Sequence, residues 1–290
     1  MTEQSQHQDP LPLRHVVLVD ASGFIFRAFH AIRILNNPQG TPVNAVYGFI
    51  TMLMKLLEDM RPDHIAVIFD SARKTFRNDI APSYKANRTE PPEELVPQFA
   101  LVREATRAFN LDCIELNGFE ADDLIATYTK EALHAGADVT IVSSDKDLMQ
   151  LVSDRVSMWD PIKNRKIGPD QVVEKFGVPP EKVVDVQSLA GDSTDNIPGI
   201  PGIGIKTAAQ LIQEYGDLET LLARASEIKQ NKRRESLIEH AEKAHLSREL
   251  VRLRNDVPLS IPLVKLQRRQ PDMAHLEQFL KEQGFKSILA

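Results

Sequence analysis

The hydrophobic positions of this chain follow two periodicities that alternate over residues 15–160. Short β-branched apolar runs predict strands, and stretches with apolar residues three or four positions apart predict amphipathic helices. We expect strands near 15–20, 64–70, 111–116, 138–143 and 155–159. We expect helices near 44–60, 93–109, 121–135 and 146–152. This alternation is typical of βαβ units, so we predict an α/β fold with a mainly parallel central sheet flanked by helices.

The pattern changes after about residue 182, where strand-like runs give way to helical spacing. Apolar side chains at 208, 211, 212 and 215 define one helical face, and 276–288 is again helix-like. We therefore predict three parts. They are a disordered N-terminal tail (1–14), an α/β core (15–182) and a helical region (183–290).

Composition fits a soluble globular protein. The chain has 290 residues, and a hydrophobic content of 42% is enough for a real core. The first fourteen residues lack the basic start and apolar stretch of a signal peptide, and no apolar run approaches the length of a membrane span. We expect a cytoplasmic location and no membrane partner. Cys113 is the only cysteine, which excludes a disulfide framework or a cysteine-rich zinc site.

Nine acidic residues stand where the predicted strands end or where later loops begin. They are Asp20, Asp70, Glu120, Asp122, Asp123, Asp145, Asp147, Asp192 and Asp195. The carboxyl ends of parallel strands share one edge of a sheet, so we expect several of these carboxylates to converge there. Crowded carboxylates repel one another unless a cation offsets their charge. Groups with only oxygen ligands suit Mg²⁺ or Mn²⁺ rather than zinc, and the pattern therefore predicts a metal site.

Helix capping is the competing explanation for these acids, because Asp is a favoured N-cap where a loop enters a helix. One helix start needs one cap, whereas Glu120, Asp122 and Asp123 crowd four consecutive positions. Capping could absorb one member of each cluster. The remaining acids call for an explanation based on charge.

The net charge of −6 argues at first against a nucleic-acid partner. Setting the nine clustered acids aside reverses the sign of the balance between 41 acidic and 35 basic side chains. Bound divalent ions would shift the local field further toward positive. Local patches are therefore a better guide to partners than the net charge.

A basic segment with interspersed aromatics, residues 73–97, follows Asp70. Its cations and the accompanying tyrosine are Arg73, Lys74, Arg77, Tyr84, Lys85 and Arg88. Basic side chains pair with phosphates and aromatic rings stack on bases, as single-stranded nucleic acid requires. A solvated polar loop explains the composition equally well. The position directly after a candidate metal ligand favours the nucleic-acid interpretation.

A glycine-rich turn precedes the helix that contains residues 208–215. Gly199, Gly202 and Gly204 would let the backbone approach a phosphate, and Lys206 would add a charge beside the free helix N-terminus. The order of glycine, apolar and lysine residues is that of a helix-hairpin-helix. The Walker pattern is absent, because Ile205 separates Gly204 from the lysine. A later basic cluster at 229–234 fits a solvated face or a DNA contact.

Taken together, these motifs resemble the 5′-nuclease (5′-3′ exonuclease) domains of bacterial DNA polymerase I, in the flap endonuclease family. The resemblance runs from about residue 15 to the C-terminus. It is carried by VDAS, AVYGF, AVIFD, FRNDIAPSYKANR, GFEADDLIAT, SSDKDLMQLV, GDSTDNIPGIPGIGIKTA and LKEQGFKSIL. It implies a PIN or flap-nuclease-like fold with a helical arch at 73–97 and a C-terminal helix-hairpin-helix subdomain.

The resemblance also implies roles for the candidate residues. The nine acids would hold two divalent ions, Mg²⁺ or Mn²⁺, with the first five nearest the reaction and Asp145, Asp147, Asp192 and Asp195 completing the second ion and the outer shell. The catalytic group would comprise Asp20, Asp70, Asp122, Lys85 and Arg88. The basic arch and the glycine turn with Lys206 would bind DNA, and a potassium ion would assist the hairpin.

The expected activity is that of a structure-specific 5′-3′ exonuclease and flap endonuclease that hydrolyses DNA with two metal ions. The resemblance implies primer removal, nick translation and repair, on DNA with a 5′ flap, nick or 5′ end and on RNA-primed duplexes. We expect a monomer in the bacterial nucleoid, with polymerase activity supplied in cis or in trans. The alternatives are a metal-dependent single-strand ribonuclease and a non-catalytic module that binds branched DNA.

Overall fold

The computed structural model describes residues 12–71 and 74–289. The predicted tail at 1–14 therefore falls mostly outside the described residues, and so does Arg73. Within these residues the sheet has six strands in the order β3-β2-β1-β4-β5-β6. The strands are β1 (His15–Asp20), β2 (His64–Ile68), β3 (Asp112–Ile114), β4 (Asp138–Val142), β5 (Val156–Asp160) and β6 (Arg165–Ile167). The first five are parallel, which confirms the predicted mainly parallel α/β sheet.

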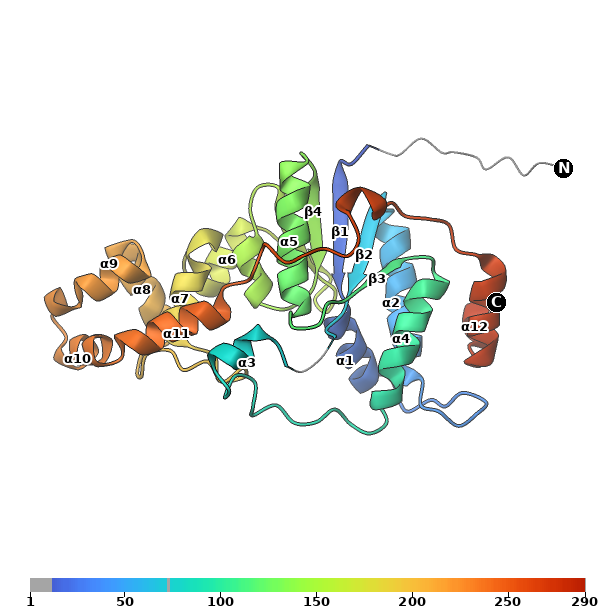
Figure 1. Cartoon of the computed structure of the whole chain (residues 1–290), viewed down its shortest axis with the longest axis horizontal. Helices are drawn as coiled ribbons and strands as arrows, with labels where there is room; N and C mark the ends of the chain where they lie inside the picture. The colour runs from blue at the N-terminus through green and yellow to red at the C-terminus, as the bar shows by residue number, and fades with distance from the viewer. Residues whose placement is uncertain (1–11, 72–73, 290) are drawn as a thin grey trace.

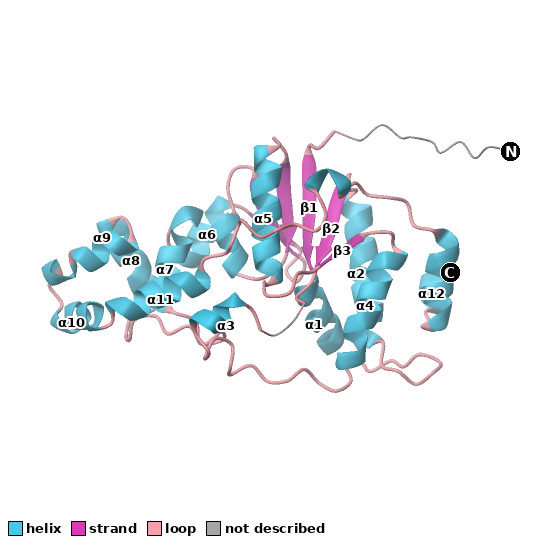
Figure 2. Cartoon of the chain, viewed as in Figure 1, coloured by secondary structure: helices cyan, strands magenta, loops and turns pink. Residues whose placement is uncertain are grey.

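Both faces of the sheet are covered by helices, as its continuous apolar strands require. Along β1, Val16 and Leu18 enter one hydrophobic core, whereas Val17 and Val19 enter the other. The N-terminal helices are α1 (Ala21–Ala31), α2 (Asn44–Met60), α3 (Phe76–Ile80), α4 (Val96–Ala108) and α5 (Ala121–His134). Helices α1, α2 and α4 contribute to one core and α5 to the other, so the sheet is the middle layer (Figure 2).

A helical subdomain extends the molecule on the α5 side of the sheet (Figure 1). It contains α6 (Pro169–Phe176), α7 (Val183–Ala190), α8 (Ile205–Tyr215), α9 (Leu218–Ala223), α10 (Asn231–Glu239) and α11 (Ala241–Val251). Short 3₁₀ turns also occur at Pro180–Lys182, Ala225–Glu227 and Leu263–Lys265. Residues Ala208, Leu211 and Ile212 of α8 are buried in the core shared with α5, as their helical spacing predicted.

The end of the chain returns to the α/β core rather than staying with the helical subdomain. The backbone N–H of Ile65 donates to the carbonyl of Leu266, which attaches the connecting segment to β2. The last helices, α12 (Met273–Glu282) and α13 (Lys286–Leu289), follow this segment. Phe279 and Phe285 are buried in the same core as α2 and α4. The region predicted as helical from 183 to 290 thus packs in two separate places.

Four local features differ from the expectations. Strand β6 is antiparallel to β5 and was not predicted, because three residues are too few to show a period. Helix α1 was missed because it begins directly after Asp20 with no polar loop between. The segment predicted as a helix at 146–152 forms only a 3₁₀ turn, Asp147–Leu151. The arch at 73–97 is helical only at α3 and at the start of α4 among its described residues.

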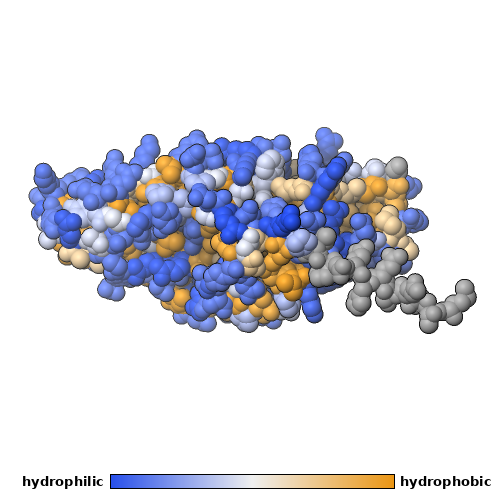
Figure 3. All heavy atoms as spheres, turned by 90° about the horizontal axis from the view of Figure 1, so that it is seen from above, coloured by the Kyte–Doolittle hydropathy of each residue, from blue (hydrophilic) through white to orange (hydrophobic). Residues whose placement is uncertain are grey.

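The exposed surface is largely polar. From above, hydrophilic side chains cover most of the visible face and apolar patches lie between them (Figure 3). None of the described helices combines the length and the apolar character needed to cross a membrane.

Candidate metal and nucleic-acid site

The parallel sheet brings distant acidic residues to one edge, as predicted. Asp20 is the last residue of β1, Asp70 follows β2 by two positions and Asp145 follows β4 by three. Glu120 precedes α5, and Asp122 lies in its first turn. Burial and then the charges of the other four raise the pKa of Asp122, and burial together with the charges of Asp70 and Asp145 raises that of Asp20, so the five form one electrostatic cluster. We call these five residues the carboxylate cluster.

Two members of the cluster, Asp20 and Asp122, have raised pKa values. Burial, together with the charge of Asp70, raises the pKa of Asp20 to about 7, although its carboxylate accepts hydrogen bonds from Ser143 and Ser22. Burial and then the charge of Asp145 raise the pKa of Asp122 well above its usual range. Among the described residues, the Asp122 carboxylate has no hydrogen-bond or ion-pair partner. No cation of the described residues therefore pairs with Asp122 directly.

Asp147 extends the acidic region toward the helical subdomain. Burial and the charge of Asp145 raise the pKa of Asp147 to about 6. The Nε2 of Gln187, on α7, donates to Asp147 Oδ1 at 2.5 Å and partly opposes this rise. Gln187 is only 3% exposed, and its Oε1 has no hydrogen-bond partner within the described structure. No sequence signal marked Gln187, because an amide inside a helix is ordinarily a surface residue.

The other acids have cationic partners. Lys85 Nζ donates to Glu120 Oε2 at 2.8 Å, and Arg88 Nη2 donates to Asp195 Oδ1 at 2.5 Å. Lys146 pairs with Asp192. Burial raises the pKa of Asp192, but the hydrogen bonds from Lys146 and Thr194 and the charge of Lys146 together lower it below its usual value. Burial disfavours the charged form of Lys85, yet the charge of Glu120 raises the pKa of this lysine overall. It therefore remains protonated at neutral pH.

The chemistry of the donor set fits divalent cations. It consists of carboxylates, several buried and repelling one another, which is the ligand type that Mg²⁺ and Mn²⁺ prefer. Among the residues that the structure describes, no three acidic, histidine or cysteine side chains are already arranged so that they could hold one ion. The structure gives a reason, since the Glu120 carboxylate is engaged by Lys85, and Asp20 and Asp70 accept hydrogen bonds from serines. These contacts would have to rearrange when an ion binds.

Asp123 and Arg77 make contacts in this structure that their predicted roles do not include. Arg77 is 1% exposed, so it does not offer its charge to DNA. Its Nη1 and Nη2 donate to both oxygens of Asp123, at 2.7 and 2.8 Å. Asp123 also accepts the backbone N–H groups of Glu120 and Arg254. With this hydrogen bonding, the buried Asp123 carboxylate attaches α3 to α5.

Tyr84 also departs from its predicted role as a stacking platform. The side chain is 4% exposed, and its hydroxyl donates to Glu120 Oε2 at 3.3 Å. The next residue, Lys85, has a φ of 55°, a left-handed conformation that is unfavourable for lysine. The Lys85 N–H donates to the carbonyl of Asp195, which stabilises this conformation. The local backbone thus directs Lys85 toward the carboxylates. Lys74, by contrast, is exposed in the same segment.

The glycine turn has two different parts. The Gly199 N–H donates to Ser247 in this structure, and a Cβ at Gly199 would lie 2.4 Å from the N of Gly191. Gly199 is thus required for close packing of two backbone segments. Gly202 and Gly204 are exposed, and a Cβ on either would meet open space. Lys206 is exposed in the first turn of α8, so this end of the turn retains the predicted accessibility.

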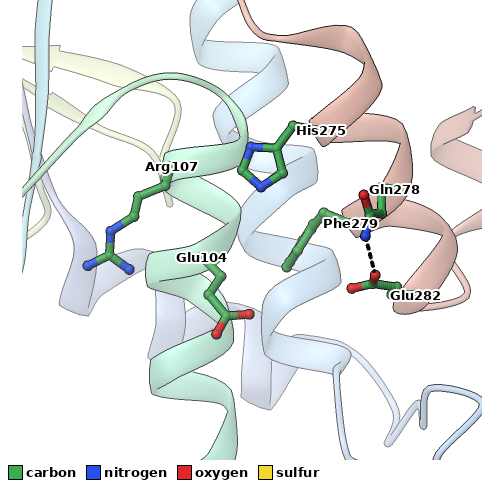
Figure 4. Close-up of a pocket in the computed structure, with 6 residues that line it drawn as sticks. All are labelled: Glu104, Arg107, His275, Gln278, Phe279 and Glu282. Atoms are coloured by element: carbon green, nitrogen blue, oxygen red, sulfur yellow. Dashed lines mark hydrogen bonds between the residues drawn. The ribbon is translucent and has the colours of Figure 1, made fainter.

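A surface pocket lies elsewhere, between α4 and α12. Figure 4 shows its lining, in which Gln278 hydrogen-bonds to Glu282 and His275 lies above Phe279. None of the nine predicted acids lines this pocket. The pocket is therefore separate from the carboxylate cluster.

Comparison with protein families agrees with this architecture. Residues 15–177 match the model described as the 5′-3′ exonuclease N-terminal resolvase-like domain, and residues 178–274 match the 5′-3′ exonuclease C-terminal SAM fold. The chain therefore belongs to the 5′-3′ exonuclease family. The predicted family resemblance and nuclease class are confirmed.

Among curated relatives, DNA polymerase I of Rhizobium leguminosarum is 60% identical over 282 residues, covering 94% of this chain and 28% of the relative. DNA polymerase I of Bacillus caldotenax is 41% identical, covering 95% and 32%. The chain thus spans about a third of the length of the curated relatives it matches.

Two solved structures have the same fold. A bacteriophage T5 flap endonuclease, described as a pseudo-enzyme-product complex with DNA and metal ions, has a TM-score of 0.72 at 21% identity, covering 93% of this chain and all of that one. The catalytic core of Rad2 in complex with DNA substrate has a TM-score of 0.62 at 17% identity, covering 94% and 90%. The predicted flap-nuclease-like fold is confirmed.

Proposed function

We propose that this protein is a divalent-metal-dependent 5′ nuclease that hydrolyses DNA phosphodiesters at 5′ flaps, nicks and 5′ ends, including those of RNA-primed duplexes. The observation that carries the proposal is the carboxylate cluster, where Asp20 is buried, Asp122 is half-buried, and both have raised pKa values. Such an arrangement is costly for folding, which is common at functional sites. The T5 structure with DNA and metal ions supports the same assignment.

The residues of the cluster would hold two Mg²⁺ or Mn²⁺ ions, with Asp145 and Asp147 contributing toward the second. When bound, the ions would stabilise the attacking and leaving oxygens of an in-line displacement. Asp192 and Asp195 would lie outside the ion ligands and would act by orienting Lys146 and Arg88, with which they pair. The chain's own residues would exclude water from Asp20 and Asp122 and position the phosphate.

Lys85 would contribute a positive charge beside the scissile phosphate. It is protonated and directed at Glu120, and its side chain is 21% exposed. Because ion binding would recruit Glu120, the ammonium would be released toward the phosphate. Charge development in the transition state would then be stabilised by a group already in place. Arg88, which is half-exposed and paired with Asp195, would hold a neighbouring phosphate.

The glycine turn at 202–206 would bind the duplex backbone through exposed N–H groups and Lys206. A potassium ion at this hairpin is part of the proposal.

The related polymerases support a polymerase activity in cis or in trans, and a role in primer removal, nick translation and repair. We further propose a monomer in the bacterial cytoplasm, at the nucleoid.

The test is cleavage of a 5′-flap duplex, of the same strand alone and of the matching RNA strand, each with Mg²⁺ or with EDTA. We expect preferential cleavage of the flap that EDTA abolishes. Preference for the single RNA strand would replace the proposal with a ribonuclease. Flap binding without cleavage in Mg²⁺ or Mn²⁺ would replace it with a non-catalytic binding module.

A further inference from the structure

Three helices of the helical subdomain converge on the glycine turn. Helix α8 begins at the turn. Ser236 of α10 donates its hydroxyl to the carbonyl of Pro201 at 2.8 Å. Ser247 of α11 accepts the N–H of Gly199 at 2.9 Å. Each of these two serines holds one face of its helix against the glycine turn. Residues one helical turn away on that face therefore lie close to the glycine turn.

The residue one turn N-terminal to each serine is an exposed lysine. Lys232 precedes Ser236 by four positions, and Lys243 precedes Ser247 by four, which places each pair on one helix face. One helical turn rises about 5.4 Å, so each lysine stands about that far along its helix from the contact with the turn. Arg233, three positions before Ser236, lies on the same side of α10.

Ion pairs neutralise two cations of the subdomain, since Arg224 pairs with Glu227 and Arg248 pairs with Glu219. Lys232, Arg233 and Lys243 have no ion-pair partner within the described part of the chain. The same is true of Lys206 at the start of α8. The three helices that meet at the turn thus each carry at least one cation without an ion-pair partner among the described residues.

We propose that Lys232, Arg233 and Lys243 form a second phosphate-binding row, which extends the duplex-binding surface from the glycine turn onto α10 and α11. The inference rests on the proposed function and specifies how far the duplex-binding surface extends beyond the glycine turn. In Figure 1, α10, α11 and α3 lie along the same lower side as the carboxyl ends of the strands, so one duplex can follow that side. The ligand is the phosphate backbone, and the row reads no sequence.

The experiment measures the affinity of the full chain in EDTA for a 5′-flap duplex and for a single strand, by fluorescence anisotropy across a range of salt concentrations. The test variant is Lys232→Gln/Lys243→Gln. The matched control is Lys265→Gln, which removes an exposed charge near the amino end of β2. A Lys232→Arg/Lys243→Arg variant retains the charge.

We expect the double glutamine variant to bind the duplex roughly 10-fold or more weakly and to lower the magnitude of the salt slope by about 2, one unit for each lost phosphate contact. Single-strand affinity, the lysine control and the arginine variant should match wild type. An unchanged duplex affinity, or an equal loss on duplex and single strand, would overturn the second row while leaving the nuclease proposal intact. Failure of the wild-type protein itself to bind duplex would overturn both.

Discussion

Asp122 and Asp123 are neighbours in the first turn of α5, but they face two regions with opposite electrostatics. Toward α3, the Asp123 carboxylate is fully buried and matched by both nitrogens of the Arg77 guanidinium. Toward the edge of the sheet, Asp122 is surrounded by four further carboxylates, and the described residues give it no partner. The difference shows that acidic residues adjacent in sequence can have opposite roles. What separates them is whether a cationic side chain of the same protein pairs with the carboxylate. The acids without one are the candidates for metal binding.

Replacing Asp122 should have the largest effect on activity. We expect Asp122→Asn to lower single-turnover flap cleavage by more than about 10³-fold, beyond the usual loss of one electrostatic contact. Flap affinity should persist, because the glycine turn and the basic arch would still bind DNA. The variant should also unfold at a higher temperature than wild type in EDTA, since a repelled buried charge is removed. Near wild-type turnover in Mg²⁺ would sink the assignment.

The neighbouring substitution should act on stability instead. Asp123→Asn leaves the buried Arg77 guanidinium without its counter-charge, so we expect a loss of about 3–5 kcal/mol in the free energy of unfolding. Arg77→Met should also destabilise the fold, because it leaves the fully buried Asp123 carboxylate without its counter-charge. Denaturant titration measures both variants. If Asp122→Asn and Asp123→Asn shift stability in the same direction by similar amounts, the contrast between the two regions is wrong.

The sequence predicted the carboxylate edge well because β1, β2 and β4 are continuous apolar runs that stop at polar residues. It could not predict which acids are neutralised. Arg77 lies 46 positions from Asp123, and Lys146 lies 46 positions from Asp192, so only the folded chain brings these charges together. The burial of Tyr84 could not be predicted for the same reason, since it depends on contacts distant in sequence such as that with Glu120.

Lys85 offers an intermediate case, a cation that the cluster itself orients. Lys85→Ala should lower the single-turnover rate by roughly 10²–10³-fold with a much smaller loss of flap affinity, because a charge aimed at the transition state affects rate more than binding. Lys74→Ala, an exposed cation of the same segment, is the matched control and should lose affinity more than rate. An equal loss of rate and affinity in Lys85→Ala would show that Lys85 only binds DNA.

Gln187 should have a smaller effect through Asp147. Gln187→Leu keeps the volume but removes the amide that orients the carboxylate, and outer groups of this kind typically change metal affinity by about 10–100-fold. We expect the Mg²⁺ concentration for half-maximal cleavage to rise by that order. The far-ultraviolet circular dichroism and the duplex affinity serve as controls. An unchanged Mg²⁺ dependence would mean that Gln187 has only a packing role.

The smallest expected effect is a shift in thermal stability with pH. The folded-state pKa values of Asp20 and Asp147, about 7 and about 6, lie above the value of 3.8 for an unperturbed Asp. Between these values the folded chain binds more protons than the unfolded chain, so its stability falls as pH rises from about 4 to 7. In EDTA the melting temperature should fall by roughly a few degrees over this range. Asp20→Asn should remove most of the slope, and a slope of the opposite sign would contradict the assigned burial.

The most direct test of the carboxylate site is a calorimetric titration of Mn²⁺ into the protein without DNA. Wild type should bind Mn²⁺, and Asp122→Asn should lose the tightest binding, whereas Asp195→Asn should change it much less because Asp195 already pairs with Arg88. Affinity should rise with pH up to about 7, since Asp20 must lose its proton before it can bind an ion. Equal Mn²⁺ binding by wild type and Asp122→Asn at neutral pH would contradict the account.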